Sequence, residues 1–193
     1  MTEHFGCVNN TIRLRSGLYL DLLAPSSSAI DIRDIAGGLS KICRFGGQCE
    51  NFYTVAEHCI GCVGVGRNDG LDDATLLALL LHDATEAYIG DVVKPLKVLL
   101  PRYAQIEASI EHAIAAAMGV DFHAARAKVL EIDHAMLIAE RRALFTPDDR
   151  TWAGENEVRR VYLTPKCMPP AQAEAKYLDE FWRLVGVGPE VRR

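Results

Sequence analysis

The feature that most constrains this 193-residue sequence is a leucine-rich run that ends in two ionisable residues. The run, residues 76–81, reads LLALLL and is followed directly by His82 and Asp83. It is apolar on nearly every side, which predicts a buried, central helix that is capped by Asp72 or Asp73 and ends near Gly90. Six apolar residues are too few to cross a bilayer. An imidazole and a carboxylate are therefore expected inside the core.

Two further ionisable residues lie on apolar stripes of predicted helices. His58 lies three residues after Val55, and Asp133 lies four residues after Val129, so each shares a helix face with apolar side chains. An unpaired charge in a core costs on the order of several kcal/mol, and such groups are normally paired or bound to a metal. Three helices that each present a ligand group inward can satisfy all of these groups with one cation.

The chemistry of this set suits a divalent metal. Imidazole nitrogens from His58 and His82 and carboxylate oxygens from Asp83 and Asp133 form a mixed nitrogen and oxygen set, which suits Mn, Co, Fe, Zn or Mg to different degrees. Such a site has open positions for water and a phosphate oxygen, and its metal activates water and polarises a phosphoryl group. Glu86, one turn beyond His82, is expected to face the same cleft and exchange a proton with that water.

Each of these residues also has a simpler interpretation. A single buried histidine is usually a hydrogen-bonded core residue, and a single aspartate on an apolar stripe is more often an ion-pair partner. A structural protein whose buried charges pair with each other would need no metal. Four such residues on three helices, all directed inward, favour the metal site.

The remaining pattern is that of an all-α protein in one domain, residues 1–193. The core spans about 31–145, and 146–193 forms a loop and a C-terminal helix. Asp31 and Thr54 are predicted N-caps, and Thr54 begins a capping box. Short strands are expected at 17–23 and 161–163. The predicted helices are 32–43, 54–67, 73–90, 101–119, 122–145 and 171–185.

Charge and cysteine content exclude several functional classes. With 21 basic and 26 acidic side chains, the net charge of −5 argues against binding to duplex DNA, although a small anion remains possible. No apolar stretch is long enough to span a membrane, and residues 1–10 lack the pattern of a signal peptide. We therefore expect a cytoplasmic protein with free thiols. Cys59 and Cys62 form a CxxC inside a predicted helix, which favours two small core side chains over a redox motif.

The ligand pattern resembles that of the HD-domain metal-dependent phosphohydrolases, above all the short bacterial 5′-deoxynucleotidases and related phage deoxynucleoside triphosphohydrolases. The similarity spans roughly residues 32–145. It includes RF at 44–45, TVAEH at 54–58, HDATEAYIGD at 82–91, Pro95, Lys97 and Asp133. The resemblance implies an HD-type helical bundle in which His58, His82, Asp83 and Asp133 bind the metal. It also implies that Glu86 is catalytic and that Asp91 is catalytic or orients the substrate.

The resemblance also indicates substrate contacts. Arg44 matches a substrate-binding arginine, although an arginine after a helix is more often a solvated charge. Phe45 stands where the nucleotidases have tryptophan, so it can stack but has no indole N–H to donate. Lys97 either neutralises phosphate or covers a helix end. The implied substrate is a small nucleotide, and the implied assembly is a homo-oligomer with no nucleic-acid polymer or membrane partner.

Alternatives from other classes remain open at this level. Other HD proteins are phosphodiesterases or alarmone hydrolases, but the short chain and the lack of a GYP-type motif count against a cyclic-dinucleotide enzyme. A non-catalytic nucleotide sensor would retain the metal site for binding alone. Glu86 and Asp91 argue against a sensor, because binding requires neither of them.

Overall fold

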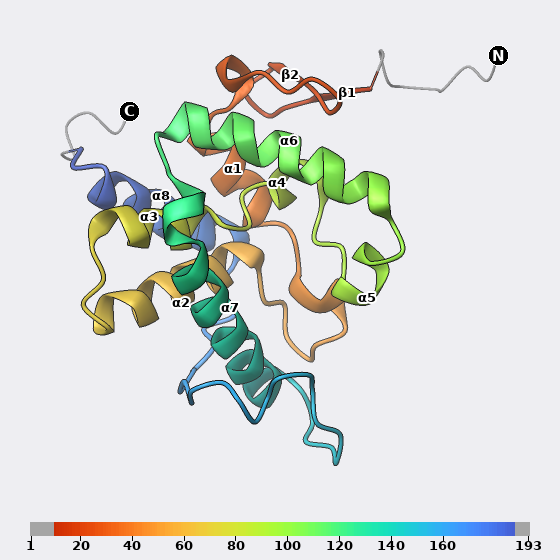
Figure 1. Cartoon of the computed structure of the whole chain (residues 1–193), viewed down its shortest axis with the longest axis vertical. Coiled ribbons are helices and arrows are strands. Elements are labelled where there is room, and N and C mark those ends of the chain that lie inside the picture. Colours follow the sequence, from red (N-terminus) through yellow and green to blue (C-terminus); the bar gives the residue numbers. More distant parts are fainter. Residues whose placement is uncertain (1–9, 188–193) are drawn as a thin grey trace.

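The computed structural model describes residues 10–187, and the fold in this range is all-α with one small hairpin, as predicted (Figure 1). The N-terminal residues 1–9, used above for the signal-peptide prediction, and residues 188–193 lie outside the described range. The elements are β1 (Thr11–Arg13), β2 (Tyr19–Asp21), η1 (Ser27–Ala29), α1 (Ile32–Leu39), η2 (Arg44–Gly47), α2 (Val55–Asn68), α3 (Asp73–Leu81), α4 (Glu86–Ile89), α5 (Lys94–Lys97), α6 (Pro101–Met118), α7 (Phe122–Leu144) and α8 (Pro170–Leu184).

Side-chain caps begin the helices at the predicted positions. The Asp31 carboxylate accepts a hydrogen bond from N–H of Arg33, which begins α1. Thr54 Oγ1 accepts from N–H of Glu57 at 3.1 Å, and Asp72 rather than Asp73 caps α3. These bonds satisfy helix N–H groups that have no partner within the helix.

Only half of the predicted capping box at Thr54 forms. Instead of turning back to the cap, the Glu57 carboxylate accepts hydrogen bonds from N–H of Lys166, Cys167 and Met168, at 2.6, 3.1 and 2.9 Å. This side chain therefore ties the segment that precedes α8 to the start of α2. The side chain of Glu57 joins two regions that are more than one hundred residues apart in sequence.

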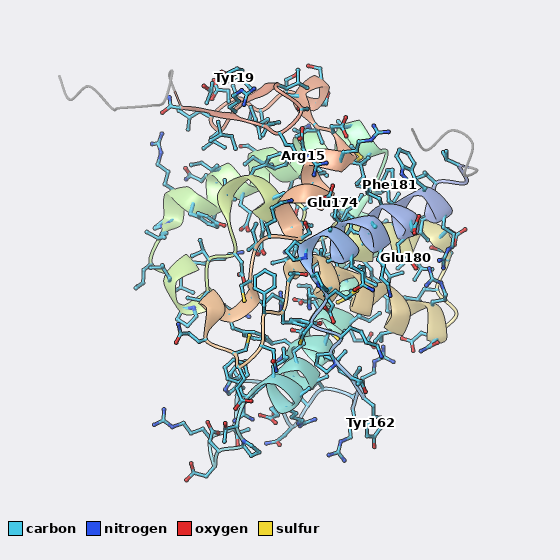
Figure 2. The ribbon with its side chains drawn as sticks, turned by 180° about the vertical axis from the view of Figure 1, so that it is seen from behind. Arg15, Tyr19, Tyr162, Glu174, Glu180 and Phe181 are labelled. Atoms are coloured by element: carbon cyan, nitrogen blue, oxygen red, sulfur yellow. The ribbon has the colours of Figure 1, made fainter. Side chains whose placement is uncertain are left out.

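The two strands form an antiparallel hairpin in which Thr11 pairs with Asp21. The predicted strand at 17–23 is confirmed as the shorter β2, but the sequence analysis missed β1. The prediction of a strand at 161–163 was wrong, because within residues 10–187 the only sheet is the β1–β2 hairpin and 161–163 has no ladder partner. Beyond β1, Arg15 Nη1 donates to Glu174 of α8 at 2.6 Å, a contact that can be followed in Figure 2.

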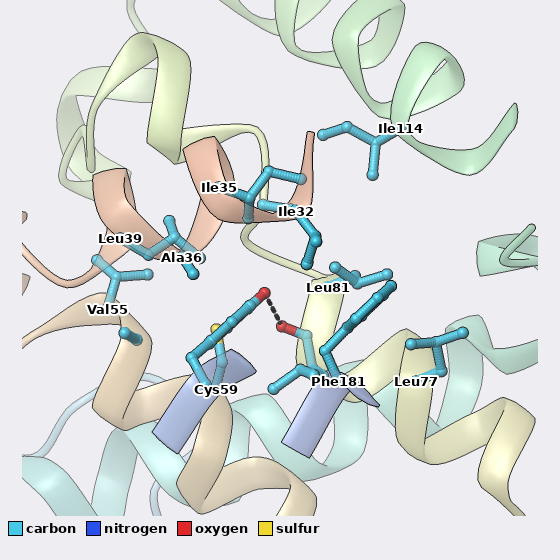
Figure 3. Packing of buried hydrophobic residues seen from close by; sticks show 14 of the residues in the cluster. Ile32, Ile35, Ala36, Leu39, Val55, Cys59, Leu77, Leu81, Ile114 and Phe181 are labelled. Carbon is cyan, nitrogen blue, oxygen red and sulfur yellow. Dashed lines mark hydrogen bonds between the residues drawn. The ribbon is translucent and has the colours of Figure 1, made fainter. Parts of the chain in front are cut away.

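The core surrounds α3, as the leucine run predicts. The side chains of Leu79, Leu80 and Leu81 are almost completely buried, and Figure 3 shows residues of α1, α2, α6 and α8 packed around the end of α3. Buried Tyr177 and Phe181 of α8 belong to this same cluster. The C-terminal helix is therefore part of the core rather than an addition to it. No helix within residues 10–187 is long and apolar enough to cross a membrane.

The predicted helix from Asp73 to Gly90 is not continuous. It ends at Leu81, residues 82–85 form turns, and α4 begins at Glu86. Within the break, N–H of Ala84 bonds to C=O of Leu81 and N–H of Glu86 to C=O of Asp83, both at 3.0 Å. These bonds between residues three apart tighten the chain and change its direction.

The prediction that the first helix extends to Cys43 was also wrong, because α1 ends at Leu39.

Gly38 lies where α1 packs against α4, and a Cβ atom there would be only 2.9 Å from Cβ of Ala87. The glycine that weakens the helical pattern is therefore required by a close approach of two helices. It allows α4, which begins at Glu86, to lie against α1.

Candidate metal centre

Four ligand-type atoms from separate parts of the chain converge in the core. Nε2 of His58 on α2 lies 3.2 Å from both Nε2 of His82 and Oδ1 of Asp133 on α7. Oδ2 of Asp83 lies 3.3 Å from Nε2 of His82 and 3.7 Å from Nε2 of His58. The distance from Nε2 of His82 to Oδ1 of Asp133 is 3.8 Å. The four predicted metal ligands therefore form one cluster.

The spacing of these atoms fits a single cation. Nitrogen and oxygen ligands lie about 2.0–2.2 Å from zinc, and two such ligands at right angles or tetrahedral angles are about 2.9–3.5 Å apart. Most of the measured separations are in or close to this range. The Asp133 side chain is 37% exposed, whereas the His58 side chain is fully buried. The cluster is thus closed on the α2 side and open to solvent beside α7.

The second nitrogen of each imidazole has an acceptor that orients the ring. Nδ1 of His82 is 2.8 Å from the carbonyl oxygen of Leu79, so Nδ1 carries the hydrogen and donates it. Nδ1 of His58 is 2.6 Å from Oε1 of Glu140, to which it donates in the same way. The Nε2 lone pairs consequently face each other inside the cluster. Carboxylate or carbonyl acceptors on the far nitrogen are typical of metal-bound histidines.

The cluster is an environment that favours positive charge. Burial alone would lower the pKa of His82, but the adjacent carboxylates of Asp83 and Asp133 outweigh it and raise that pKa. Burial and the charge of Arg44 would lower the pKa of His58, but the adjacent Cys62, Glu140 and Asp133 outweigh them and raise it. Burial would raise the pKa of Asp133, yet its contacts with both histidines hold that pKa well below the usual range. In the absence of a metal, protons on the imidazoles supply the required positive charge.

Arg44 lies in the site and is not solvated at a helix end. Its Nε atom donates to Oε2 of Glu140 at 3.1 Å, and its Nη2 atom lies 3.0 Å from the same oxygen in an ion pair. Nη1 lies 3.5 Å from Oδ2 of Asp83. The arginine side chain is only 10% exposed. The interpretation of Arg44 as a surface charge is therefore wrong, and its guanidinium group lies next to the ligand cluster.

A left-handed turn gives Arg44 this position. Phe45 has φ +59°, and the two glycines that follow it also have positive φ values. A bulky residue rarely adopts this conformation without compensating contacts. The ring of Phe45 packs 5.3 Å from Cζ of Arg44, 5.1 Å from the ring of Phe145 and 6.2 Å from that of Trp152. Phe45 thus lies beside the candidate site as predicted, within an aromatic cluster that the sequence did not indicate.

Glu86 is a buried carboxyl group with an unusual proton affinity. Burial and the nearby charges of Asp83 and Asp91 raise its pKa to about 8. Its Oε1 atom is 3.4 Å from Nζ of Lys97, and its buried Oε2 atom has no hydrogen-bond partner within the described chain. Lys97 also donates to Glu107 at 2.9 Å. Lys97 is therefore held between two carboxylates beside the site.

Asp91 follows Gly90 at the end of α4, as the sequence places it. Burial and the charge of Asp83 raise its pKa, whereas the charges of Arg44 and Lys97 oppose this shift. Asp91 therefore belongs electrostatically to the same group of charges. No hydrogen bond fixes its side chain among those described.

Comparisons with known proteins give relatives without a described activity. The chain is 40% identical over 123 residues to "Uncharacterized protein YfdR" of Escherichia coli (strain K12), a match that covers 64% of this chain and 66% of that protein. It is 36% identical over 107 residues to "Uncharacterized protein RCAP_rcc00048" of Rhodobacter capsulatus, covering 53% of this chain and 55% of that protein. The matched part spans less than two thirds of either relative. No protein-family model matches the chain.

Glu140 is a site residue that was not predicted from the sequence. It is fully buried and follows Asp133 by seven residues, two helical turns, so both lie on the same face of α7. That spacing is the signal that could have found it.

The cysteines on α2 also lie closer to the cluster than expected. The five cysteines within the described range are free, and Cys59 and Cys62 are buried as predicted for core thiols. Sγ of Cys62 is nevertheless 3.6 Å from Nε2 of His58. The ligand atoms of His58, Cys62 and His82 lie within 4.8 Å of one another, as do those of Cys59, His82 and Asp83. These groupings could hold a metal ion, so the described residues offer sulfur as well as nitrogen and oxygen ligands.

Proposed function

We propose that this protein is a divalent-metal-dependent phosphohydrolase that acts on deoxynucleotides. The observation that carries the proposal is the convergence of four nitrogen and oxygen atoms beside a buried arginine and a buried carboxyl group of raised pKa. A structural ion-pair cluster would account for the aspartates and histidines. It would not account for Glu86, whose buried Oε2 has no hydrogen-bond partner among residues 10–187, at a cost of about 1–3 kcal/mol.

In this proposal His58, His82, Asp83 and Asp133 hold the cation. Two imidazoles and two carboxylates are acceptable ligands for Mn, Co, Fe, Zn or Mg. When bound, the cation supplies a Lewis acid that favours deprotonation of an attacking water and polarises a phosphoryl oxygen. The partly exposed Asp133 side chain is the side from which we expect water and substrate to reach the cluster.

Arg44 contributes by binding the phosphate group. Glu140 occupies the Nε and Nη2 edge of the guanidinium group, whereas Nη1 faces Asp83. Hydrogens on Nη1 and Nη2 thus remain for a phosphate oxygen that lies next to the ligand cluster. An arginine in this arrangement stabilises the negative charge that develops during hydrolysis.

Glu86 exchanges a proton with the attacking water or the leaving group. Its raised pKa of about 8 lies near the pH of a cell, where a carboxyl group both gives and takes protons effectively. Lys97, 3.4 Å away, supports the ionised form of Glu86. Asp91 orients the substrate or the water from the end of α4.

Two reactions fit this arrangement and the resemblance described above. With a deoxynucleoside monophosphate, water cleaves the phosphate ester and releases a deoxynucleoside and inorganic phosphate. With a triphosphate, attack at the α-phosphorus releases the deoxynucleoside and triphosphate. The same resemblance favours a homo-oligomer.

The direct test is product release from a panel of deoxy- and ribonucleoside mono- and triphosphates. The protein is first treated with a chelator, and Mn, Co, Mg or Zn is then added. Metal-dependent release of inorganic phosphate from monophosphates supports a nucleotidase. Release of intact inorganic triphosphate from a nucleoside triphosphate supports a triphosphohydrolase. If no metal restores hydrolysis of any nucleotide, the proposed function is wrong.

E86A distinguishes an enzyme from a nucleotide sensor. An enzyme should lose turnover by about 10²–10⁴-fold while it still binds the metal, because Glu86 is not among the cluster atoms. A sensor should bind nucleotide as before and have no turnover to lose.

A further inference from the structure

Glu140 is a fully buried carboxylate whose two oxygens contact different groups. Oε1 lies 2.6 Å from Nδ1 of His58. Oε2 accepts from Nε of Arg44 at 3.1 Å and forms an ion pair with Nη2 at 3.0 Å. The exposed fraction of its side chain is zero. Glu140 thus forms a bridge of hydrogen bonds from a cluster imidazole to the adjacent guanidinium.

A purely structural role does not explain this arrangement well. Moving a carboxylate from water into a protein core costs several kcal/mol. An ion pair with Arg44 alone would use only one of its two oxygens. The geometry instead gives each carboxylate oxygen its own partner, since Oε1 lies against the His58 imidazole and Oε2 against the Arg44 guanidinium group. Glu140 therefore acts on both partners at once.

We infer that Glu140 is a positioning residue that couples cation binding at His58 to phosphate binding at Arg44. This inference rests on the metal and phosphate site of the proposed function. On one side, the Glu140 charge fixes the His58 ring and makes Nε2 a stronger ligand. On the other side, it fixes one edge of the Arg44 guanidinium group.

The position of Arg44 indicates how Glu140 affects phosphate binding. With Nε and Nη2 held by Glu140, Nη1 lies 3.5 Å from Oδ2 of Asp83, one of the cluster atoms. A phosphate oxygen that contacts a cation in the cluster would thus be close to Nη1. Without Glu140, the guanidinium group loses the contacts that hold it there, so phosphate affinity should fall together with metal affinity.

E140Q separates the two effects of Glu140. The glutamine has nearly the same shape and keeps an oxygen that can accept from Nδ1 of His58. However, its amide N–H₂ would oppose the N–H groups of Arg44, and its negative charge is gone. We would measure Co²⁺ affinity by titration of the chelated protein, and inorganic phosphate affinity of the Co²⁺-loaded protein by calorimetry.

The expected result has two parts. E140Q should weaken Co²⁺ binding about 10–100-fold, in the wild type and equally in an R44A background, because this effect passes through His58. It should weaken phosphate binding in the wild-type background only. The double variant R44A/E140Q should bind phosphate as weakly as R44A alone, because the phosphate effect passes through Arg44.

E155Q is the matched control, since Glu155 also accepts from arginines of α7, Arg141 and Arg142, but lies outside the site. It should leave both affinities unchanged. If E140Q does not fold, E140D replaces it with the same expected directions. The inference is wrong if E140Q leaves the Co²⁺ affinity within twofold of the wild type. It is also wrong if the losses of phosphate affinity caused by R44A and E140Q add fully in the double variant. Neither readout requires turnover, so loss of both affinities with no nucleotide hydrolysis would reject the proposed function alone.

Discussion

Nε2 of His58 lies 3.2 Å from Nε2 of His82, although the residues are 24 positions apart in sequence. Nδ1 of each ring already has an acceptor, so the two lone pairs meet with only a cation or a proton able to bind between them. Two aspartates complete the cluster around the same point. This relationship leads to the first two predictions.

Metal binding should stabilise the fold. Addition of Mn²⁺, Co²⁺ or Zn²⁺ to the chelated protein should raise its Tm, since a ligand at one hundred times its Kd stabilises by about 2.7 kcal/mol. H58A should abolish this shift, whereas H134A should retain it, because His134 bonds to the carbonyl oxygen of Ala153 instead of joining the cluster. An identical Tm with metal and with chelator would contradict the prediction.

Metal affinity should increase with pH. The raised pKa values of His58 and His82 mean that the metal-free site holds protons that a cation must displace. Calorimetric titrations in buffers of different ionisation enthalpy should therefore show proton release, largest at the acidic end of the range. A metal affinity that stays constant from pH 5.5 to about 8 would show that the imidazoles of the metal-free protein carry no extra proton.

E86Q should stabilise the chelated protein at alkaline pH. The folded-state pKa of Glu86 is about 8, above its usual 4.5, so unfolding releases a proton between these values and rising pH favours the unfolded state. The wild type should therefore lose stability relative to E86Q from about pH 4.5 to 8, by at most about 1.4 kcal/mol per pH unit. Thermal unfolding of the wild type and E86Q at pH 5 and pH 8 checks this. If the difference in Tm between the two proteins is the same at both pH values, the prediction is wrong.

K97M should shift the pH dependence of turnover. The Lys97 charge lowers the pKa of Glu86, so its removal should raise that pKa further. If Glu86 acts in its ionised form, the ascending limb of the kcat/KM profile moves to higher pH. K94M, which changes an exposed lysine three residues earlier in the same short helix, should leave the profile in place. An unshifted limb in K97M would mean that Lys97 does not influence the essential group.

G38A should destabilise the protein and G64A should not. A Cβ at Gly38 would be 2.9–3.0 Å from Cβ and backbone atoms of Ala87, which cannot move away as a flexible side chain could. The expected loss is about 1–3 kcal/mol, with lower activity because Ala87 adjoins Glu86. Gly64 lies within α2, and no described atom outside the local helix backbone lies within 4 Å of its Cβ position, so alanine there should stabilise by about 0.5–1 kcal/mol. Chemical denaturation of the three proteins measures both effects.

The parts of the site that could be predicted are those that depend on helical periodicity. His58 and Asp133 each share a helix face with apolar residues three or four positions away, so the buried face of each helix carries its ionisable group inward. The caps at Asp31, Thr54 and Asp72 are just as local, since each side chain bonds to an N–H two or three residues ahead.

The parts that could not be predicted depend on contacts between distant segments. Helical periodicity does not indicate the break at His82, after which α4 packs against α1 at Gly38. The inward position of Arg44 depends on Glu140, 96 residues later. Taken by itself, an arginine after a helix favours a solvated charge, and only the family resemblance indicated that Arg44 binds the substrate.

The sequence by itself determined the all-α class, most helix boundaries and the four ionisable side chains that face the core. These features depend on interactions within one or two helical turns, where residue spacing fixes the geometry. Only the tertiary structure decided that the four side chains meet at one point and that Glu140 joins His58 to Arg44. It also decided that Glu86 is buried with one oxygen that has no hydrogen-bond partner in the described part of the chain. Such relationships depend on how helices pack against each other, and packing is set by the summed shape of many side chains rather than by the spacing of a few.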